Sequence, residues 1–234
     1  MGWFPAELRG PPMALFCKDQ PAGRASCLNW TPPGLLIIEQ FLKPQLCRRW
    51  RRDFMDQPTT AATVNQVDPK TGRTAKVVDD QRVTEAVPLE RVKTEVVKQV
   101  SLAYRDAVTP FFNAQLDTFS APSVLKYLPG GKYDAHADSE HWDHAGEQWV
   151  KSMDRDYSLL LYINDDYEGG ALYFPNFDIR IQPKSGMLVA FPSDHRYLHT
   201  AEPLQSGERF VVVSWANDKR SPTKISRLRS VWPT

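Results

Sequence analysis

The sequence predicts a mainly β protein with flanking helices (α+β), built on an antiparallel sandwich or jelly roll. Short runs rich in β-branched and aromatic residues fill the second half of the chain, and glycine-containing turns separate most of them. The first half carries two helical patterns. With 234 residues, 41% of them hydrophobic, the chain can bury a core of single-domain size.

The chain is expected to begin with an irregular segment that leads into a strand and a helix. Residues 1–33 are rich in Pro and Gly, which predicts an extended N-terminal arm. The short apolar run 34–39 predicts a strand. Pro44 then suits the first turn of a helix that continues to about Phe54.

A long loop and the main helix follow. Residues 57–76 are rich in Thr, Ala, Asn, Asp and Gly, with a turn signal at 68–72, and predict a long, mobile loop. A broken apolar stripe over 89–112 predicts the main amphipathic helix, ending near Pro110 or just beyond.

The second half is expected to supply the strands of the sandwich. The predicted strands are residues 121–127, 157–163, 171–174, 179–181, 187–191 and 210–215. We therefore expect one domain over 34–216, followed by a basic C-terminal tail over 217–234.

Composition narrows the classes of partner and compartment. The 29 Lys and Arg residues nearly cancel the 28 Asp and Glu residues, which argues against nucleic acid or an anionic membrane as partner. Cys17, Cys27 and Cys47 are an odd, clustered set, unlike a disulfide framework. No secretory or myristoylation signal is seen, and no apolar run approaches the roughly 18 residues that span a bilayer. We expect a cytoplasmic protein.

One histidine and one aspartate are spaced for a shared metal ion. His136 and Asp138 stand two residues apart, and in an extended chain both side chains point to the same face. A non-haem Fe(II) site needs two His and one carboxylate on one face and leaves the other positions open. His199 and His195, in a connection between two strands, are the candidates for the third ligand.

The open positions of such a site suit a 2-oxo acid and O2. A bound 2-oxo acid needs a cation for its remote carboxylate. Arg209, at the start of an apolar β-run, offers a planar fork of donors that can bind a carboxylate through two hydrogen bonds.

Five ordered stretches carry a resemblance to a known family: residues 127–138, 159–165, 168–175, 183–191 and 199–210. They resemble the 2-oxoglutarate/Fe(II) dioxygenase superfamily and, within it, the prolyl 4-hydroxylase-like branch. The resemblance covers roughly residues 34–216 and is densest from 123 onward. It implies a double-stranded β-helix (jelly roll) core.

The resemblance also implies roles for individual residues. Iron would be held by His136, Asp138 and His199, because only His199, and not His195, is followed by the Thr-Ala-Glu-Pro of the family pattern. Arg209 would anchor 2-oxoglutarate, with Tyr127 as a second contact to the same carboxylate.

The implied activity is hydroxylation of an unactivated C–H bond, foremost of a prolyl residue in a peptide or protein. The cofactors would be Fe(II), 2-oxoglutarate and O2, with ascorbate as reductant. Asp138 argues for a hydroxylase, because related halogenases lack this carboxylate. Arg209 stands where animal collagen prolyl hydroxylases carry lysine, which argues against a collagen-type substrate.

Three alternatives stay open from the sequence. The substrate could be a free amino acid or another small metabolite. The chain could be a jelly-roll binding module without catalysis, although all the expected ligands are present. A nucleic-acid dealkylase is disfavoured, because the next arginine after Arg209 is Arg220, in the tail. The primary substrate, its regiochemistry and the oligomeric state are not specified.

A polar insertion over 139–156 is expected to border the mouth of the pocket. Trp142 and Trp149 are its foremost candidates for touching a substrate, and Tyr133 and Trp215 are further candidates outside it. His141 and His144 could also form a second metal pair at helical spacing, although solvated loop histidines are the favoured interpretation.

Overall fold

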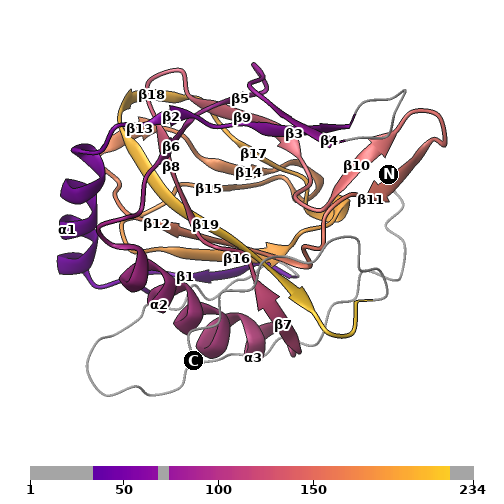
Figure 1. The fold of residues 1–234 in the computed structure, drawn as a ribbon, viewed down its shortest axis with the longest axis horizontal. Coiled ribbons are helices and arrows are strands. Elements are labelled where there is room, and N and C mark those ends of the chain that lie inside the picture. The colour runs from indigo at the N-terminus through magenta and orange to yellow at the C-terminus, as the bar shows by residue number, and fades with distance from the viewer. Residues whose placement is uncertain (1–33, 68–73, 222–234) are drawn as a thin grey trace.

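Two antiparallel sheets face each other in the computed structural model, which describes residues 34–67 and 74–221 (Figure 1). The larger sheet has eight strands. Seven lie in the order β1 (Leu36–Ile38), β16 (Leu188–Pro192), β12 (Tyr157–Tyr162), β19 (Arg209–Asp218), β8 (Ser123–Tyr127), β6 (Glu85–Val87) and β2 (Thr60–Ala61), and β7 (Leu116–Phe119) also pairs with β19.

The smaller sheet has five strands, and the described residues also form three separate two-stranded sheets. Its order is β15 (Ile179–Ile181), β14 (Leu172–Phe174), β17 (His199–Ala201), β9 (Lys132–His136) and β5 (Arg82–Val83). The pairs are β3 (Val64–Val67) with β4 (Thr74–Val77), β10 (Glu140–Asp143) with β11 (Gln148–Lys151), and β13 (Tyr167–Gly169) with β18 (Leu204–Gly207). Short 3-10 turns are η3 (Pro175–Phe177) and η4 (His195–Tyr197).

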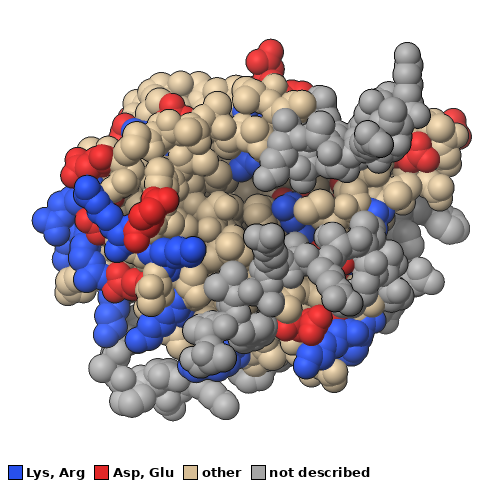
Figure 2. Space-filling view, in the orientation of Figure 1, with Lys and Arg blue, Asp and Glu red and all other residues tan. Residues whose placement is uncertain are grey.

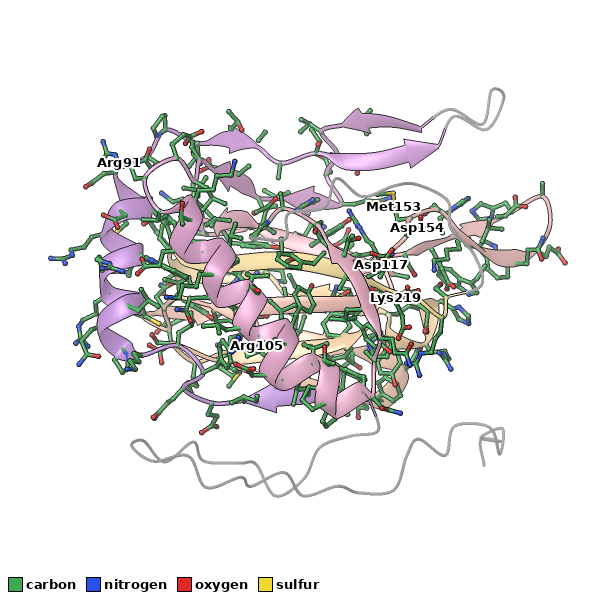
Figure 3. The ribbon with its side chains drawn as sticks, turned by 60° about the horizontal axis from the view of Figure 1, so that its bottom comes forward. Arg91, Arg105, Asp117, Met153, Asp154 and Lys219 are labelled. Carbon is green, nitrogen blue, oxygen red and sulfur yellow. The ribbon has the colours of Figure 1, made fainter. Side chains whose placement is uncertain are left out.

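The helices cover the outer face of the larger sheet. They are α1 (Pro44–Met55), α2 (Lys93–Ala103), the π turn η2 (Tyr104–Val108) and α3 (Thr109–Phe112). Figure 3 shows α2 and the following η2 crossing that face, and Arg105 of η2 is exposed. Pro110 has no N–H to donate to the preceding turn, and the wider π turn stands directly before α3.

Alternation along β19 divides the core into two layers. Phe210 and Val212 belong to the cluster packed under the helices, whereas Val211 and Val213 belong to the cluster between the sheets. Successive side chains of a strand point to opposite faces, so Arg209 shares the inner face with Val211 and Val213. This places a charged residue between the sheets.

The predicted fold class is confirmed: the chain is mainly β, with antiparallel sheets and flanking helices. The helix that opens at Pro44 and six of the seven predicted strands agree with the structure to within two residues at each end, and the seventh, β19, runs on to Asp218. The main helix begins at Lys93 rather than at 89 and ends at Phe112, beyond Pro110.

The prediction of a long loop over 57–76 was wrong. The segment contains β2, β3 and β4, and Val64 pairs with Val77 at one end of the β3–β4 ladder. Its Thr and Asn residues gave a loop-like composition, but backbone pairing does not require an apolar face. The predicted turn at 68–72 lies outside the described residues.

The two predicted terminal segments are also largely outside the described residues. The arm over 1–33 is not among them, and of the tail only 217–221 is described, with 217 and 218 belonging to β19. Among the described residues, no helix combines the length and the apolar character needed to cross a membrane. Lys and Arg side chains stand among Asp and Glu side chains over α1 (Figure 2), so this face has no field of a single sign.

Candidate functional site

Two histidines and an aspartate meet where β9 and β17 pair. His136 lies directly opposite His199 across this antiparallel ladder, and Asp138 follows two residues after His136. The Nε2 atom of His136 is 3.6 Å from Asp138 Oδ1, and the Nε2 atom of His199 is 3.7 Å from Asp138 Oδ2. One ligand atom from each of the three residues lies within 4.8 Å of the others.

Backbone carbonyls orient both imidazole rings. His136 Nδ1 lies 2.8 Å from the Asp134 carbonyl oxygen, and His199 Nδ1 lies 3.1 Å from that of Tyr197. A carbonyl only accepts, so each Nδ1 carries the proton and each Nε2 is left with a free lone pair. Both lone pairs face Asp138, which is the arrangement that a metal-binding histidine requires.

The ionisation of Asp138 and His199 matches that of metal ligands. Burial alone would raise the pKa of Asp138, but His199, His136 and Arg155 outweigh it and hold this pKa well below its usual value. Burial, with His136 nearby, lowers the pKa of His199 to about 4, although Asp138 acts against this. An ionised carboxylate and a neutral imidazole are the forms that bind metal ions.

Aromatic rings pack around the two histidines. The Tyr133 ring stacks on His136 with centroids 3.5 Å apart and an interplanar angle of 17°. Phe191 lies edge-on to His199 at 4.7 Å, and Phe174 is 5.9 Å away. This packing limits rotation of both imidazoles.

A cavity of about 570 Å³ opens over the three residues. Its walls come from the inner faces of both sheets, and its lining includes His136, Asp138, His199 and Arg209. The volume is within the range of small-molecule sites. The predicted cosubstrate anchor and the candidate metal ligands therefore share one cavity.

Arg209 is a buried cation with free donor capacity. Its side chain is only 2% exposed, its Nη1 donates to the carbonyl of Gly170, and its Cζ lies 3.9 Å from the ring centroid of Tyr127. Its Nε is buried and has no hydrogen-bond partner in the described part of the chain. An unpaired buried charge is costly, so a ligand carboxylate fits this position.

Gly170 allows this close approach. Its φ of +64° lies in the left-handed region, and a Cβ there would stand 3.1 Å from Arg209 Nη1 and 2.8 Å from Leu204 Cδ1. Tyr127 is opposite Arg209 in the β8–β19 ladder, which holds its ring against the guanidinium. Tyr162, which was not predicted, also lines the cavity.

Two further arginines line the cavity nearer the aspartate, and the sequence did not single them out. Arg155 Nη1 donates to the backbone carbonyl of Asp138 at 3.0 Å, and its Cζ lies 3.8 Å from the ring centroid of Trp215. Arg82 Cζ lies 4.9 Å from the ring centroid of Tyr133. Arg82 opens a strand and Arg155 precedes one, and neither position carries a sequence motif. Only the tertiary fold shows that both side chains face the site.

The four candidate substrate contacts divide into two pairs. Tyr133 and Trp215 line the cavity. Trp142 and Trp149 do not: they oppose each other on β10 and β11, with Trp142 41% exposed and Trp149 stacked on His195 at 5.2 Å. The polar insertion forms a β-hairpin, at whose base Figure 3 places Met153 and Asp154.

The three remaining histidines, His141, His144 and His195, do not form a second metal pair. His195 Nδ1 is 2.6 Å from Glu140 Oε2, so this ring is committed to another partner. The helical spacing considered for His141 and His144 was wrong, because His141 lies on β10 and exposed His144 in the turn beyond it. His141 lines the cavity, and its Nδ1 is buried without a partner among the described residues.

Comparison with known proteins agrees with this geometry. Residues 122–217 match the model of the 2OG-Fe(II) oxygenase superfamily, and all three candidate ligands and Arg209 lie within the match. A putative prolyl 4-hydroxylase of Acanthamoeba polyphaga mimivirus is 30% identical over 119 residues, which are 47% of this chain and 49% of that protein. Prolyl 3-hydroxylase 2 of Rattus norvegicus is 37% identical over 148 residues, 55% of this chain and 21% of that protein.

A solved structure shows the same fold. The prolyl hydroxylase of Trichoplax adhaerens, in complex with a hypoxia inducible factor peptide fragment, has a TM-score of 0.55 at 20% identity, covering 80% of this chain and 84% of that one. The chain spans half or less of the length of the first curated relatives that it matches. The resemblance to 2-oxoglutarate/Fe(II) oxygenases of the prolyl 4-hydroxylase-like type is confirmed.

Proposed function

We propose that this protein is a 2-oxoglutarate- and Fe(II)-dependent dioxygenase that hydroxylates a prolyl residue in a peptide or protein. The observation that carries the proposal is the shared cavity of about 570 Å³, in which the His136, Asp138 and His199 side chains converge and Arg209 has a buried Nε–H without a partner among the described residues. The match to the oxygenase superfamily supports it. We further propose ascorbate as the reductant that maintains Fe(II).

The residues present fit the implied metal ion. His136 and His199 offer Nε2 lone pairs and Asp138 offers a carboxylate, so these three would hold Fe(II) and leave its remaining positions to ligands. When bound, Fe(II) with O2 supplies the oxidising chemistry, in which 2-oxoglutarate, O2 and R–H give succinate, CO2 and R–OH.

The protein's own contribution is binding, orientation and exclusion of water. Arg209 binds the remote carboxylate of 2-oxoglutarate with its Nε–H and with the edge of the guanidinium that does not face Gly170. The Gly170 carbonyl and the Tyr127 ring keep the guanidinium in place. Because Arg209 is almost completely buried, this ion pair forms away from water. Tyr133 and Trp215 line the same cavity and are the proposed contacts of the primary substrate.

A peptidyl prolyl substrate is supported by what the similar proteins are named. The curated relatives include prolyl 4- and prolyl 3-hydroxylases, and the Trichoplax adhaerens structure holds a peptide fragment. Hydroxylation at carbon 3 and at carbon 4 both occur among those names. The proposal therefore specifies a prolyl ring as the substrate and does not specify which of its carbons is hydroxylated.

A free amino acid or another small metabolite is the second candidate substrate. Arg82 and Arg155 line the same cavity, and a guanidinium suits the free carboxylate that a peptide bond lacks. These two substrates therefore define the two arms of the test.

The test is release of succinate from 2-oxoglutarate by the full chain with Fe(II), O2 and ascorbate. Proline-rich peptides are compared with free amino acids, and the product is examined by mass spectrometry for an added 16 Da, as expected for one oxygen atom. We expect peptide-dependent succinate and a hydroxylated peptide. Stimulation by free amino acids alone would exclude the peptidyl substrate.

Two controls separate catalysis from binding. His199→Ala should abolish succinate release, because one of the three ligands is lost. Arg180→Lys, a surface change at an exposed ion pair, should leave it unchanged. If the wild-type protein forms no succinate under any condition, the chain is a binding module and the proposal fails.

A further inference from the structure

The carboxylate of Asp138 accepts a hydrogen bond from a residue of the larger sheet, although Asp138 itself follows a strand of the smaller sheet. Ser158, on β12, donates its hydroxyl to Asp138 Oδ2 at 2.6 Å. Ser193, just after β16, lies 2.8 Å from Ser158, oxygen to oxygen. Ser158 and Ser193 are 2% and 1% exposed, so water does not compete with these bonds.

The direction of this hydroxyl chain follows from the bond to Asp138. The single Ser158 hydroxyl proton is donated to Asp138 Oδ2. Ser158 then has only lone pairs to offer to Ser193, and Ser193 must donate to Ser158. Hydrogen bonds linked head to tail in this way polarise and strengthen one another.

The segments on both sides are fixed by backbone bonds. Ser139, which follows Asp138, donates through its N–H and its hydroxyl to the Ser193 carbonyl, both at 3.0 Å. Arg155 donates to the Asp138 carbonyl rather than to the carboxylate. Ser158 is therefore the group that determines which carboxylate oxygen of Asp138 is free.

We infer that Ser158, supported by Ser193, is a positioning residue that makes Asp138 bind the metal ion through Oδ1 alone. This inference rests on the proposed function. Each carboxylate oxygen lies near one histidine, Oδ1 at 3.6 Å from His136 Nε2 and Oδ2 at 3.7 Å from His199 Nε2, and the Ser158 hydroxyl binds only Oδ2. A carboxylate that bound through both oxygens would fill one of the positions that 2-oxoglutarate and O2 need. Groups hydrogen-bonded to metal ligands commonly control their orientation in this way.

The closing experiment reads the metal directly, with Co(II) as a probe that does not turn over. Apo full-length protein is titrated with Co(II) under anaerobic conditions, and affinity and the d–d absorption bands are recorded for wild type, Ser158→Ala, Ser158→Thr and Ser193→Ala. We expect Ser158→Ala to weaken Co(II) binding by about 10-fold or more and to change the bands. Ser158→Thr should restore both, and Ser193→Ala should give a smaller change.

A matched control is available on the neighbouring strand. Ser214 on β19 is fully buried and donates to the Ser120 carbonyl, with no contact to Asp138. Ser214→Ala loses a buried serine hydroxyl of the same sheet and should leave the Co(II) bands unchanged. Circular dichroism of every variant shows whether it is folded.

The outcomes separate this inference from the proposed function. If wild type binds Co(II) no better than His199→Ala does, both fail. If wild type binds and Ser158→Ala gives the same affinity and bands, only the role of Ser158 is overturned. Should Ser158→Ala not fold, Ser193→Ala decides, because a wild-type spectrum and affinity in that variant would overturn the two-hydroxyl chain.

Discussion

On β12 and β19, side chains that are neighbours in sequence serve two different regions of the molecule. Phe210 and Leu161 lie in the apolar layer under the helices, whereas Arg209 and Tyr162 face the cavity between the sheets. The apolar layer supplies free energy of folding through buried area. The cavity face buries polar groups, which costs stability unless a ligand completes them. The strand period therefore allows stability and chemistry to be altered separately.

The strongest test of this contrast is Phe210→Ala in the apolar layer. Phe210 is fully buried and its ring centroid lies 6.0 Å from that of Phe54. We expect a loss of about 3–5 kcal/mol in the free energy of unfolding, because a large cavity is left. Urea denaturation measures it, and Phe210→Leu, which keeps more of the volume, should cost less. A loss below about 1 kcal/mol would contradict the assignment of this layer to stability.

On the cavity face, Arg209→Leu should have the opposite profile. We expect the KM for 2-oxoglutarate to rise about 100-fold, equivalent to about 2.7 kcal/mol, because a charge-assisted carboxylate contact is lost. The free energy of unfolding of the apo protein should stay the same or increase, since a buried unpaired charge is removed. Steady-state kinetics and urea denaturation of the same samples check both. A large loss of stability would contradict the separation of the cavity face from the apolar layer that stabilises the fold.

The pH dependence of apo-protein stability is a smaller effect on the same face. The pKa of His199 is lowered to about 4 in the folded state, below its value of about 6.5 when unfolded. Below pH 6.5 the unfolded state therefore binds more protons, and stability falls as the pH falls toward 4. We expect a loss of roughly 1–2 kcal/mol between pH 6.5 and 5. Urea midpoints across this window measure it.

Two variants sharpen the assignment to His199. His144→Gln, at an exposed position, should leave the slope of stability against pH unchanged. His199→Gln should flatten it. An equal slope in wild type and His199→Gln would place the titrating group elsewhere.

The smallest effect is expected outside both regions. Arg180 and Glu202 form a bidentate ion pair on the outer side of the smaller sheet, with Arg180 55% exposed. Glu202→Gln should change the free energy of unfolding by less than about 0.5 kcal/mol, because water and salt screen the pair. Thermal unfolding at low and high salt measures it. A change of several kcal/mol would show that this side also contributes to stability.

The sequence was most informative where local pattern and tertiary structure coincide. The β-branched runs predicted the strands of the larger sheet, and the spacing of His136 and Asp138 predicted their common face. The resemblance supplied His199, which periodicity could not have paired with His136 across 63 residues of chain.

Residues that act through tertiary contacts were missed. Ser158 is the one small polar residue inside the otherwise aromatic and aliphatic run Tyr157–Tyr162. This break in the apolar run was the only sequence signal that could have marked it. Arg155 has no such signal, because its neighbours Trp215 and Asp138 are distant in sequence. The hairpin of β10 and β11 was taken for a polar insertion because polar residues flank Trp142 and precede Trp149, so that neither strand shows an apolar run.

The register of β9 against β17 has a consequence for the order of folding. His136 and His199 meet only through a ladder between strands far apart in the chain, so the contact closes a long loop and forms late. The unfolded chain then offers a metal ion the local pair His136 and Asp138 without His199, so the complete site is absent until the two strands have paired. Binding of the ion slows unfolding of the finished sandwich, so the metal should lengthen the lifetime of the native state more than it speeds its formation.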